Sequence, residues 1–197
     1  MRFSFSLLLM GGALAVGAVA SAQGYDTRTM AAPNAPFSRF HSFHLLPTPR
    51  ARNGAHRSGA YDPMVSGSIA SRALRAAVAC ELGELGYHDV EWMPDFVVAI
   101  YAATREPLDL TAWDYAYNRS PSWWPMSEVD QSPAIYPAGT VIVDVVNPET
   151  LDVLWRGSAM IALDHDPLVN AKELANAAAA IIDRFPRAKP IVVAAKR

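Results

Sequence analysis

Apolar residues recur at helical spacing between residues 66 and 85, which predicts an amphipathic helix there. The stripe expected to face the core is Ile69, Ala73, Ala77 and Cys80, widened by Leu74, Val78, Leu82 and Leu85. Ser66 or Ser68 can cap the free amides at the start, and Gly86 can take the left-handed conformation that ends a helix. Because Cys80 falls in this apolar pattern, we expect it to be buried as a small apolar side chain.

A second helical pattern extends from residue 168 to residue 185. Its apolar stripe consists of Leu174, Ala178, Ile181 and Phe185. Asp166 followed by Pro167 is typical of a helix cap and a first-turn proline, and Pro186 ends the pattern.

Four segments have the character of strands. Residues 37–46 contain closely spaced aromatic side chains and end at a proline. Residues 95–104 are apolar on both faces, so this strand should be covered on both sides. Residues 140–146 and 151–163 are two more strands, and residues 147–150 between them (Asn-Pro-Glu-Thr) have the composition of a tight hairpin turn.

Trp155 lies in the last of these strands, where we expect it to belong to the core. Because side chains alternate along a strand, Val153, Trp155 and Gly157 should share one face, and Gly157 should leave room for a packed neighbour beside the indole. The order of elements predicts an α+β fold, with an antiparallel or mixed sheet of about four to five strands and two helices packed on it.

Residues 111–136 fit neither periodicity and are too rich in proline for a helix. The segment contains the aromatic residues Trp113, Tyr115, Tyr117, Trp123, Trp124 and Tyr136. Exposed rings favour contact with a protein, a sugar or a membrane interface, and loops carry binding more often than scaffolds do. These aromatic residues are therefore a candidate contact surface, and the alternative is that they form a small core that covers the sheet.

The first 22 residues have the layout of a secretory signal peptide. A positive start at Arg2 precedes the apolar run 7–20, and Ala20-Ser21-Ala22 is a small-x-small cleavage site, so cleavage is expected between Ala22 and Gln23. The apolar run is shorter than the stretch of about 20 residues that a membrane helix needs. We therefore expect a periplasmic or secreted product.

Three segments should make up the remainder. Residues 23–36, rich in Ala, Pro, Asn and Thr, are expected to be a disordered leader. Residues 37–186 are short enough for a single domain, and residues 187–197 are expected to be a C-terminal tail.

Charge and cysteine content limit the classes of partner and membrane anchor that we expect. The formal charge is −2, with neither a basic stripe nor an acidic run, so nucleic acid and anionic lipid are poor candidates. The one cysteine, Cys80, is far from the expected cleavage site, so no lipid anchor is expected.

Several segments resemble the DUF4136 family, small bacterial envelope domains that are often lipoproteins. The matching segments are FHSFHLLP, YDPMVSGSIASRALRAAVACELGELGY, PDFVVAIYAATRE, GTVIVDVVNPETLDVLWRGSA and IIDRFP. The residues most specific for the family are Gly139-Thr140, Asp144 and Trp155-Arg156-Gly157. The resemblance implies the fold and an envelope location, and it implies no catalytic motif. Many members carry a lipobox cysteine, which this chain lacks.

Three groups of residues were weighed as reactive or metal sites. Asp164-His165-Asp166 offers two carboxylates and an imidazole, although adjacent residues point in different directions and a helix cap explains Asp166. His41 and His44 are three residues apart on a strand and should lie on opposite faces. A glycoside hydrolase would need a pair of carboxylates, and the four candidates near the aromatic segment are Asp109, Asp114, Glu128 and Asp130.

The favoured hypothesis is a non-catalytic binding or structural domain of the envelope, with no cofactor or metal and with residues 111–136 as its contact surface. Its partner would be an envelope protein or a glycan. The alternative hypothesis is an envelope hydrolase that acts on a saccharide or peptide through the carboxylates near residues 111–136. A metal carrier that uses Asp164, His165 and Asp166 is a third hypothesis.

Overall fold

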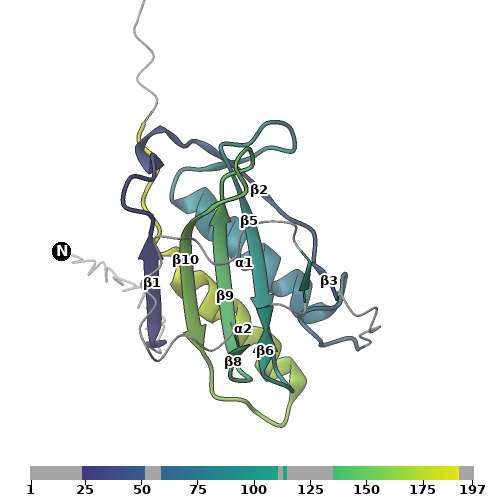
Figure 1. Cartoon of the computed structure of the whole chain (residues 1–197). Coiled ribbons are helices and arrows are strands. Elements are labelled where there is room, and N and C mark those ends of the chain that lie inside the picture. The colour runs from purple at the N-terminus through teal and green to yellow at the C-terminus, as the bar shows by residue number, and fades with distance from the viewer. Residues whose placement is uncertain (1–23, 52–58, 111–112, 115–134, 191–197) are drawn as a thin grey trace, which may run out of the picture.

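The computed structural model describes residues 24–51, 59–110, 113–114 and 135–190. Two helices, α1 (Ile69–Glu84) and α2 (Pro167–Ile182), pack against each other and lie on the same face of a mixed sheet (Figure 1). This arrangement confirms the predicted α+β class. Within the described residues, no helix has both the length and the apolar character needed to cross a membrane.

The main sheet has six strands, more than the sequence pattern predicts. In spatial order they are β1 (Thr27–Ala31), β10 (Val153–Met160), β9 (Thr140–Val146), β5 (Phe96–Ala102), β2 (Ser42–Leu45) and β4 (His88–Asp89). Strand β2 is parallel to β5 and β4, and the other neighbours are antiparallel. Two small sheets pair β3 (Arg50–Ala51) with β7 (Trp113–Asp114), and β6 (Leu108–Asp109) with β8 (Ile135–Tyr136).

Strand β1 corrects the predicted extent of the domain. Residues 23–36 were expected to be disordered, but Thr27–Ala31 pair antiparallel with β10 at the edge of the main sheet. The phenolic hydroxyl of Tyr25 donates a hydrogen bond of 2.6 Å to Glu173 of α2, which fastens the start of β1 to the helix layer. The hydrogen-bonding partners of β1 lie in β10, far along the chain, so the composition of residues 23–36 alone could not predict this strand.

The predicted strand over residues 37–46 is shorter than expected. Phe37–Arg39 form a single 3-10 turn, and β2 begins only at Ser42. The carboxylate of Asp95, just before β5, accepts hydrogen bonds from the His41 amide and from the amide and hydroxyl of Ser42. Partial burial would raise the pKa of Asp95, but these hydrogen bonds outweigh it and lower that pKa below its ordinary value.

Both helices begin at the predicted caps. The Ser68 hydroxyl accepts from the Ser71 amide, and the Asp166 carboxylate accepts from the Leu168 amide, with Pro167 in the first turn of α2. Gly86 follows α1 with a φ of 93°, the left-handed conformation that the sequence predicts. The apolar stripe predicted for α2 is buried throughout.

The buried stripe of α1 only partly matches the prediction. Leu74, Val78, Leu82 and Leu85 are buried. Ile69, Ala73 and Ala77 are only partly buried. Cys80 is exposed, contrary to the expectation for a small apolar side chain, and its thiol lies 3.9 Å from a Glu84 carboxylate oxygen. Ala70 and Ser71, which are outside the predicted stripe, are buried as well. The buried stripe is therefore rotated about the helix axis relative to the prediction, and Cys80 lies on the exposed side of α1.

The β9–β10 hairpin forms where predicted, but a bulge in β10 changes which side of the sheet the side chain of Val153 occupies. The Asn147 side chain accepts hydrogen bonds from the amides of Glu149 and Thr150 in the turn. The register then shifts between Val153 and Trp155. An extra residue in one strand reverses the alternation of side chains, so Val153 packs on the face opposite Trp155, against the prediction that they share one.

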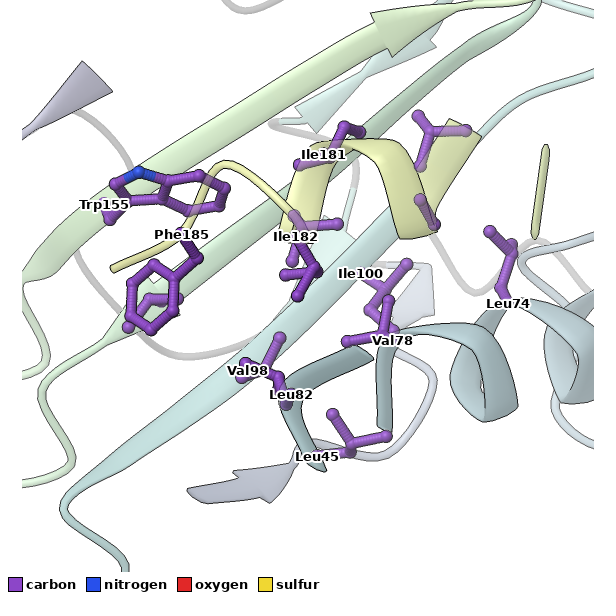
Figure 2. Close-up of a cluster of buried hydrophobic side chains, with 14 of the residues drawn as sticks. Leu45, Leu74, Val78, Leu82, Val98, Ile100, Trp155, Ile181, Ile182 and Phe185 are labelled. Carbon is purple, nitrogen blue, oxygen red and sulfur yellow. The ribbon is translucent and has the colours of Figure 1, made fainter. Parts of the chain in front are cut away.

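The main core lies between the sheet and the helices. Trp155, only 2% exposed, contacts the Phe185 ring edge-to-face with 5.2 Å between centroids. Figure 2 shows these two rings side by side at one end of the cluster, with Ile181 and Ile182 of α2 next to them. A Cβ atom on Gly157 would contact Ile181 and would lie 2.5 Å from Cη2 of Trp155, which explains the glycine beside the indole.

A second, smaller core covers part of the opposite face. Ala99 and Tyr101 of β5 and Ile142 of β9 are buried there. Among the described residues, their cover comes from Met64 and from Leu108 and Leu110, which lie in and beside β6. Strand β5 is therefore covered on both sides, as its doubly apolar pattern predicts.

Candidate binding site on the helix-free face

The face of the sheet opposite α1 and α2 contains a hollow of about 400 Å³ at its β1–β10–β9 side. It is lined by Asp26, Arg28, Met30, Tyr136, Pro137, Thr140, Arg156, Ser158, Ala159 and Met160. Pockets for small ligands commonly enclose about 300–1,000 Å³, so the hollow has room for a ligand. The register explains its lining, because Arg28 lies opposite Ser158 and Met30 opposite Arg156.

One lining residue of this hollow, Arg156, belongs to a buried ion pair. The Arg156 guanidinium donates to both carboxylate oxygens of Asp144, at 2.5 Å from Nε and 2.6 Å from Nη2. The two residues face each other across β10 and β9, and they are 6% and 0% exposed. Two parallel charge-assisted hydrogen bonds fix the plane of the guanidinium, so Arg156 presents a rigid surface to the hollow.

Arg28 and Asp26 supply charge at the outer side of the hollow. Both are exposed, and they are two residues apart, so they project on the same side of the chain at β1. Arg28 forms no ion pair with any residue that the structure describes. Its guanidinium is therefore available to an anionic group from outside.

The other lining groups are hydroxyls and flexible apolar side chains. Thr140 and Ser158 bring hydroxyls from β9 and β10, and Tyr136 brings a ring and a phenol from β8. Met30 and Met160 line the same hollow, and thioether side chains adapt to ligands of irregular shape. Asp26 is the one carboxylate among the described lining residues.

The aromatic candidates from residues 111–136 are only partly placed. Tyr136 lies in β8 and lines the hollow, whereas Trp113 lies in β7, which pairs with β3 in a separate small sheet. The other four candidates, Tyr115, Tyr117, Trp123 and Trp124, lie outside the described residues.

The carboxylates of Asp164 and Asp166 are used locally. Asp164 accepts a hydrogen bond from the Asp166 amide, and Asp166 accepts one from the Leu168 amide as the cap of α2. His165 is exposed between them. Among the described residues, no group of three or more His, Cys, Asp or Glu side chains is arranged to hold a metal ion.

The residues of the hydrolase hypothesis lie in different places. Asp109 belongs to β6 and Asp114 to β7, which pair with different strands in two separate small sheets. Glu128 and Asp130 lie outside the described residues.

The two histidines considered as metal ligands are also placed by the structure. His44 of β2 contacts Asp89 of β4 at 3.3 Å, and His41 precedes β2.

Sequence reasoning missed most of the hollow. Arg28 and Asp26 fall in the segment that the sequence predicts to be a leader, and Arg156 stands out only through the family resemblance. The signal that could have revealed the ion pair is one acidic and one basic residue, each inside an otherwise apolar strand of the same hairpin. A separate exposed ring was also missed: Trp92, between β4 and β5, is 83% exposed.

Comparison with known proteins gives one family and several distant structures. Residues 27–187 match the model of DUF4136, a domain of unknown function. A DUF4136 family protein from Bacteroides thetaiotaomicron VPI-5482 is similar with 17% identity and a TM-score of 0.48, covering 77% of this chain and 92% of that one. No curated protein matches the sequence.

Two other solved structures are similar at lower identity. A PDZ domain protein from Parabacteroides distasonis ATCC 8503 has 14% identity and a TM-score of 0.45; the match covers 83% of this chain and 36% of that longer chain. A PelC dodecamer from Paraburkholderia phytofirmans has 13% identity and a TM-score of 0.37, with 80% and 92% of the two chains covered.

The family match starts at the first residue of β1 and ends beyond α2. It contains the Asp144–Arg156 ion pair and every strand of the main sheet. Because residues 27–187 are most of the sequence and hold both helices and all six of these strands, the chain belongs to the DUF4136 family.

Proposed function

We propose that this protein is a non-catalytic binding or structural domain of the bacterial cell envelope, and that it contacts its partner through the sheet face opposite α1 and α2. The observation that carries the proposal is the hollow of about 400 Å³ beside Tyr136, lined by an available arginine, by hydroxyls and by methionines. The partner is an envelope glycan or protein. The aromatic residues of 111–136 belong to this proposal through Tyr136, which joins that segment to the hollow.

The composition of the hollow supports binding over catalysis. Its described lining combines hydrogen-bonding groups of both kinds with apolar side chains, which is the usual composition of a ligand pocket. General acid–base chemistry needs titratable groups within hydrogen-bond reach of the reacting atoms. Here the Asp144 carboxylate is held by Arg156, and Asp26 lies on the exposed rim.

A pocket-filling variant tests the binding function. Ser158→Trp would place an indole in the hollow from the middle of β10, and Ser38→Trp would add the same side chain at an exposed position in the 3-10 turn. Capture of glycan or protein from envelope extract should be lost in Ser158→Trp and retained in Ser38→Trp, with unchanged circular dichroism in both. Equal capture by both variants would refute the hollow as the contact site.

The aromatic segment has its own test. If Trp123 and Trp124 contribute to the contact surface, replacing both with alanine should abolish capture while leaving the thermal midpoint nearly unchanged. A large loss of stability in this double variant would show instead that the segment is structural cover.

The envelope location rests on the signal-peptide pattern of residues 1–22. Mass spectrometry of protein expressed from the full sequence in a bacterial host should find Gln23, or the pyroglutamate formed from it, at the N-terminus of a periplasmic product. Recovery of protein that retains Met1 from the membrane fraction would contradict export by cleavage.

A further inference from the structure

We propose that the ligand of the hollow is a saccharide that carries a carboxylate, and that its acid group pairs with Arg28. This inference rests on the proposed binding function and specifies the ligand class for the same site. The features that point to it are one available guanidinium, several hydroxyl-bonding groups and a volume of about 400 Å³.

The carboxylate follows from the different states of the two arginines. Arg156 already donates two hydrogen bonds to Asp144 inside the sheet, so its charge is balanced before any ligand arrives. Arg28 is exposed, lies on the diagonal from Arg156 across β1 and β10, and has no ion-pair partner among the described residues. A guanidinium matches the planar geometry of a carboxylate with two parallel donors.

The neighbouring Asp26 limits how much negative charge the ligand can carry. Its carboxylate lies two residues from Arg28 on the same side and lines the same hollow. A polyanion such as an acidic peptide or a nucleic acid would place further negative charges against Asp26, which is unfavourable. A single acid group surrounded by neutral hydroxyls avoids this repulsion, and Asp26 can then accept hydrogen bonds from those hydroxyls.

The remaining lining suits a sugar ring. The hydroxyls of Thr140 and Ser158 can both donate and accept, as the hydroxyls of a sugar do. The ring of Tyr136 and the side chains of Met30 and Met160 offer apolar contact for the C–H groups of the ring. The hollow therefore provides a partner for each kind of group on a uronic acid: a guanidinium for the carboxylate, hydroxyls for the hydroxyls, and apolar side chains for the C–H groups.

Isothermal titration calorimetry with matched probes tests the inference, using protein expressed from the full sequence. The probes are glucuronate- and galacturonate-containing disaccharides, their neutral glucose and galactose counterparts, and a glutamate dipeptide. We expect the uronates to bind and the neutral sugars to bind at least tenfold more weakly. Arg28→Gln should weaken uronate binding about 10- to 100-fold, the loss of one charge-assisted contact. Raising the salt concentration should weaken binding by the parent protein, because Arg28 is exposed.

Matched variants separate the charge from its geometry. Arg39→Gln removes an exposed arginine from the 3-10 turn, outside the hollow, and should leave uronate affinity unchanged. Arg28→Lys keeps the charge but loses the planar fork, so its affinity should lie between those of the parent and Arg28→Gln. All three variants should keep the parent's unfolding midpoint.

The other outcomes distinguish this inference from the proposed function. Equal binding of neutral and acidic sugars, or preference for the glutamate dipeptide, would overturn the acidic saccharide. If no probe binds while Ser158→Trp still abolishes capture from envelope extract, the ligand class is wrong and the binding function stands. If no probe binds and Ser158→Trp captures as well as the parent, both proposals fail.

Discussion

The two faces of the main sheet differ in what covers them. The face under α1 and α2 is lined mainly by apolar side chains, and helix residues such as Leu74 and Ile181 meet it along its length (Figure 2). The opposite face has an apolar cluster only around β5, whereas charged and hydroxyl side chains occupy its β1–β10 side. Among the described residues, the two helices pack along one sheet face, while loops and two-residue strands cover part of the other and border the hollow.

The border between these regions on the second face is the Asp144–Arg156 pair. Asp144 is fully buried yet lies two residues from the apolar Ile142, on the same side of β9. Burying a charge is costly unless it is paired and hydrogen-bonded, and the two contacts from Arg156 meet that requirement. Four predictions test whether the faces differ in this way.

Breaking the ion pair should have the largest effect on the second face. Arg156→Met would remove the two hydrogen bonds that Arg156 donates to the buried Asp144 carboxylate, and breaking a buried ion pair in this way typically costs about 3–5 kcal/mol of unfolding free energy. Replacing both residues, as Asp144→Leu with Arg156→Met, should recover most of that loss because no charge is left buried. Urea denaturation of the parent and the variants, including Asp144→Leu alone, gives the coupling energy. A double variant as unstable as the sum of its single variants would contradict a direct pair.

Trp155→Ala should be comparably damaging on the helix-covered face. The indole is buried against Phe185, and removal of a large buried ring typically costs about 3–5 kcal/mol through lost burial and the cavity left behind. Chemical denaturation measures the change, and Trp92→Ala is the matched control because that ring is 83% exposed. Similar losses in both variants would show that the exposure of the two rings has been assigned wrongly.

Gly157→Ala should test how closely α2 approaches the sheet. The added Cβ would meet Ile181 and the Trp155 ring, and overpacking of this kind typically costs about 1–3 kcal/mol. Gly83→Ala is a suitable comparison, because a Cβ there meets nothing within 4 Å and the position is helical, so this variant should be neutral or stabilising. Thermal unfolding monitored by circular dichroism distinguishes the two outcomes. An unchanged midpoint in Gly157→Ala would place α2 farther from the sheet.

Tyr25→Phe should have the smallest effect, about 0.5–1.5 kcal/mol for one lost hydrogen bond between β1 and α2. Burial, together with the hydrogen bond to Glu173 and its charge, raises the pKa of Tyr25 from 10.0 to about 12. Folding therefore favours the protonated phenol. The contribution of Tyr25 to the free energy of unfolding is complete below pH 10 and is lost as the pH rises through 12. The stability difference between parent and variant should be constant from pH 7 to pH 9. It should shrink above pH 10, as measured by urea denaturation. A difference that grows with alkaline pH would have the wrong sign.

Much of the local structure could be predicted because its signals lie within a few residues. Hydrogen bonds or φ values set by neighbours in sequence define the helix caps, the residue after α1 and the hairpin turn. These features belong to Ser68, Asp166, Gly86 and Asn147. The buried stripe of α2 followed from its period alone. The family resemblance is also confirmed, because the family model matches residues 27–187.

The failures share a different cause. The exposure of Cys80 depended on which side of α1 packs against the rest of the protein, and the facing of Val153 depended on a bulge against β9. The candidate site was missed for the same reason: its residues come from β1, β8, β9 and β10, and only Tyr136 was selected from the sequence.

The sequence by itself determined the helix caps, the position of the hairpin turn, the α+β class and a pattern that predicts export. Only the tertiary structure decided that residues 27–31 are a strand, that Asp144 and Arg156 pair, and that Arg28 lies beside a hollow. The physical reason is the range of the interactions involved. Caps and turns are satisfied by neighbours along the chain, whereas an edge strand, an ion pair across a sheet and a pocket all require partners that folding brings from distant segments.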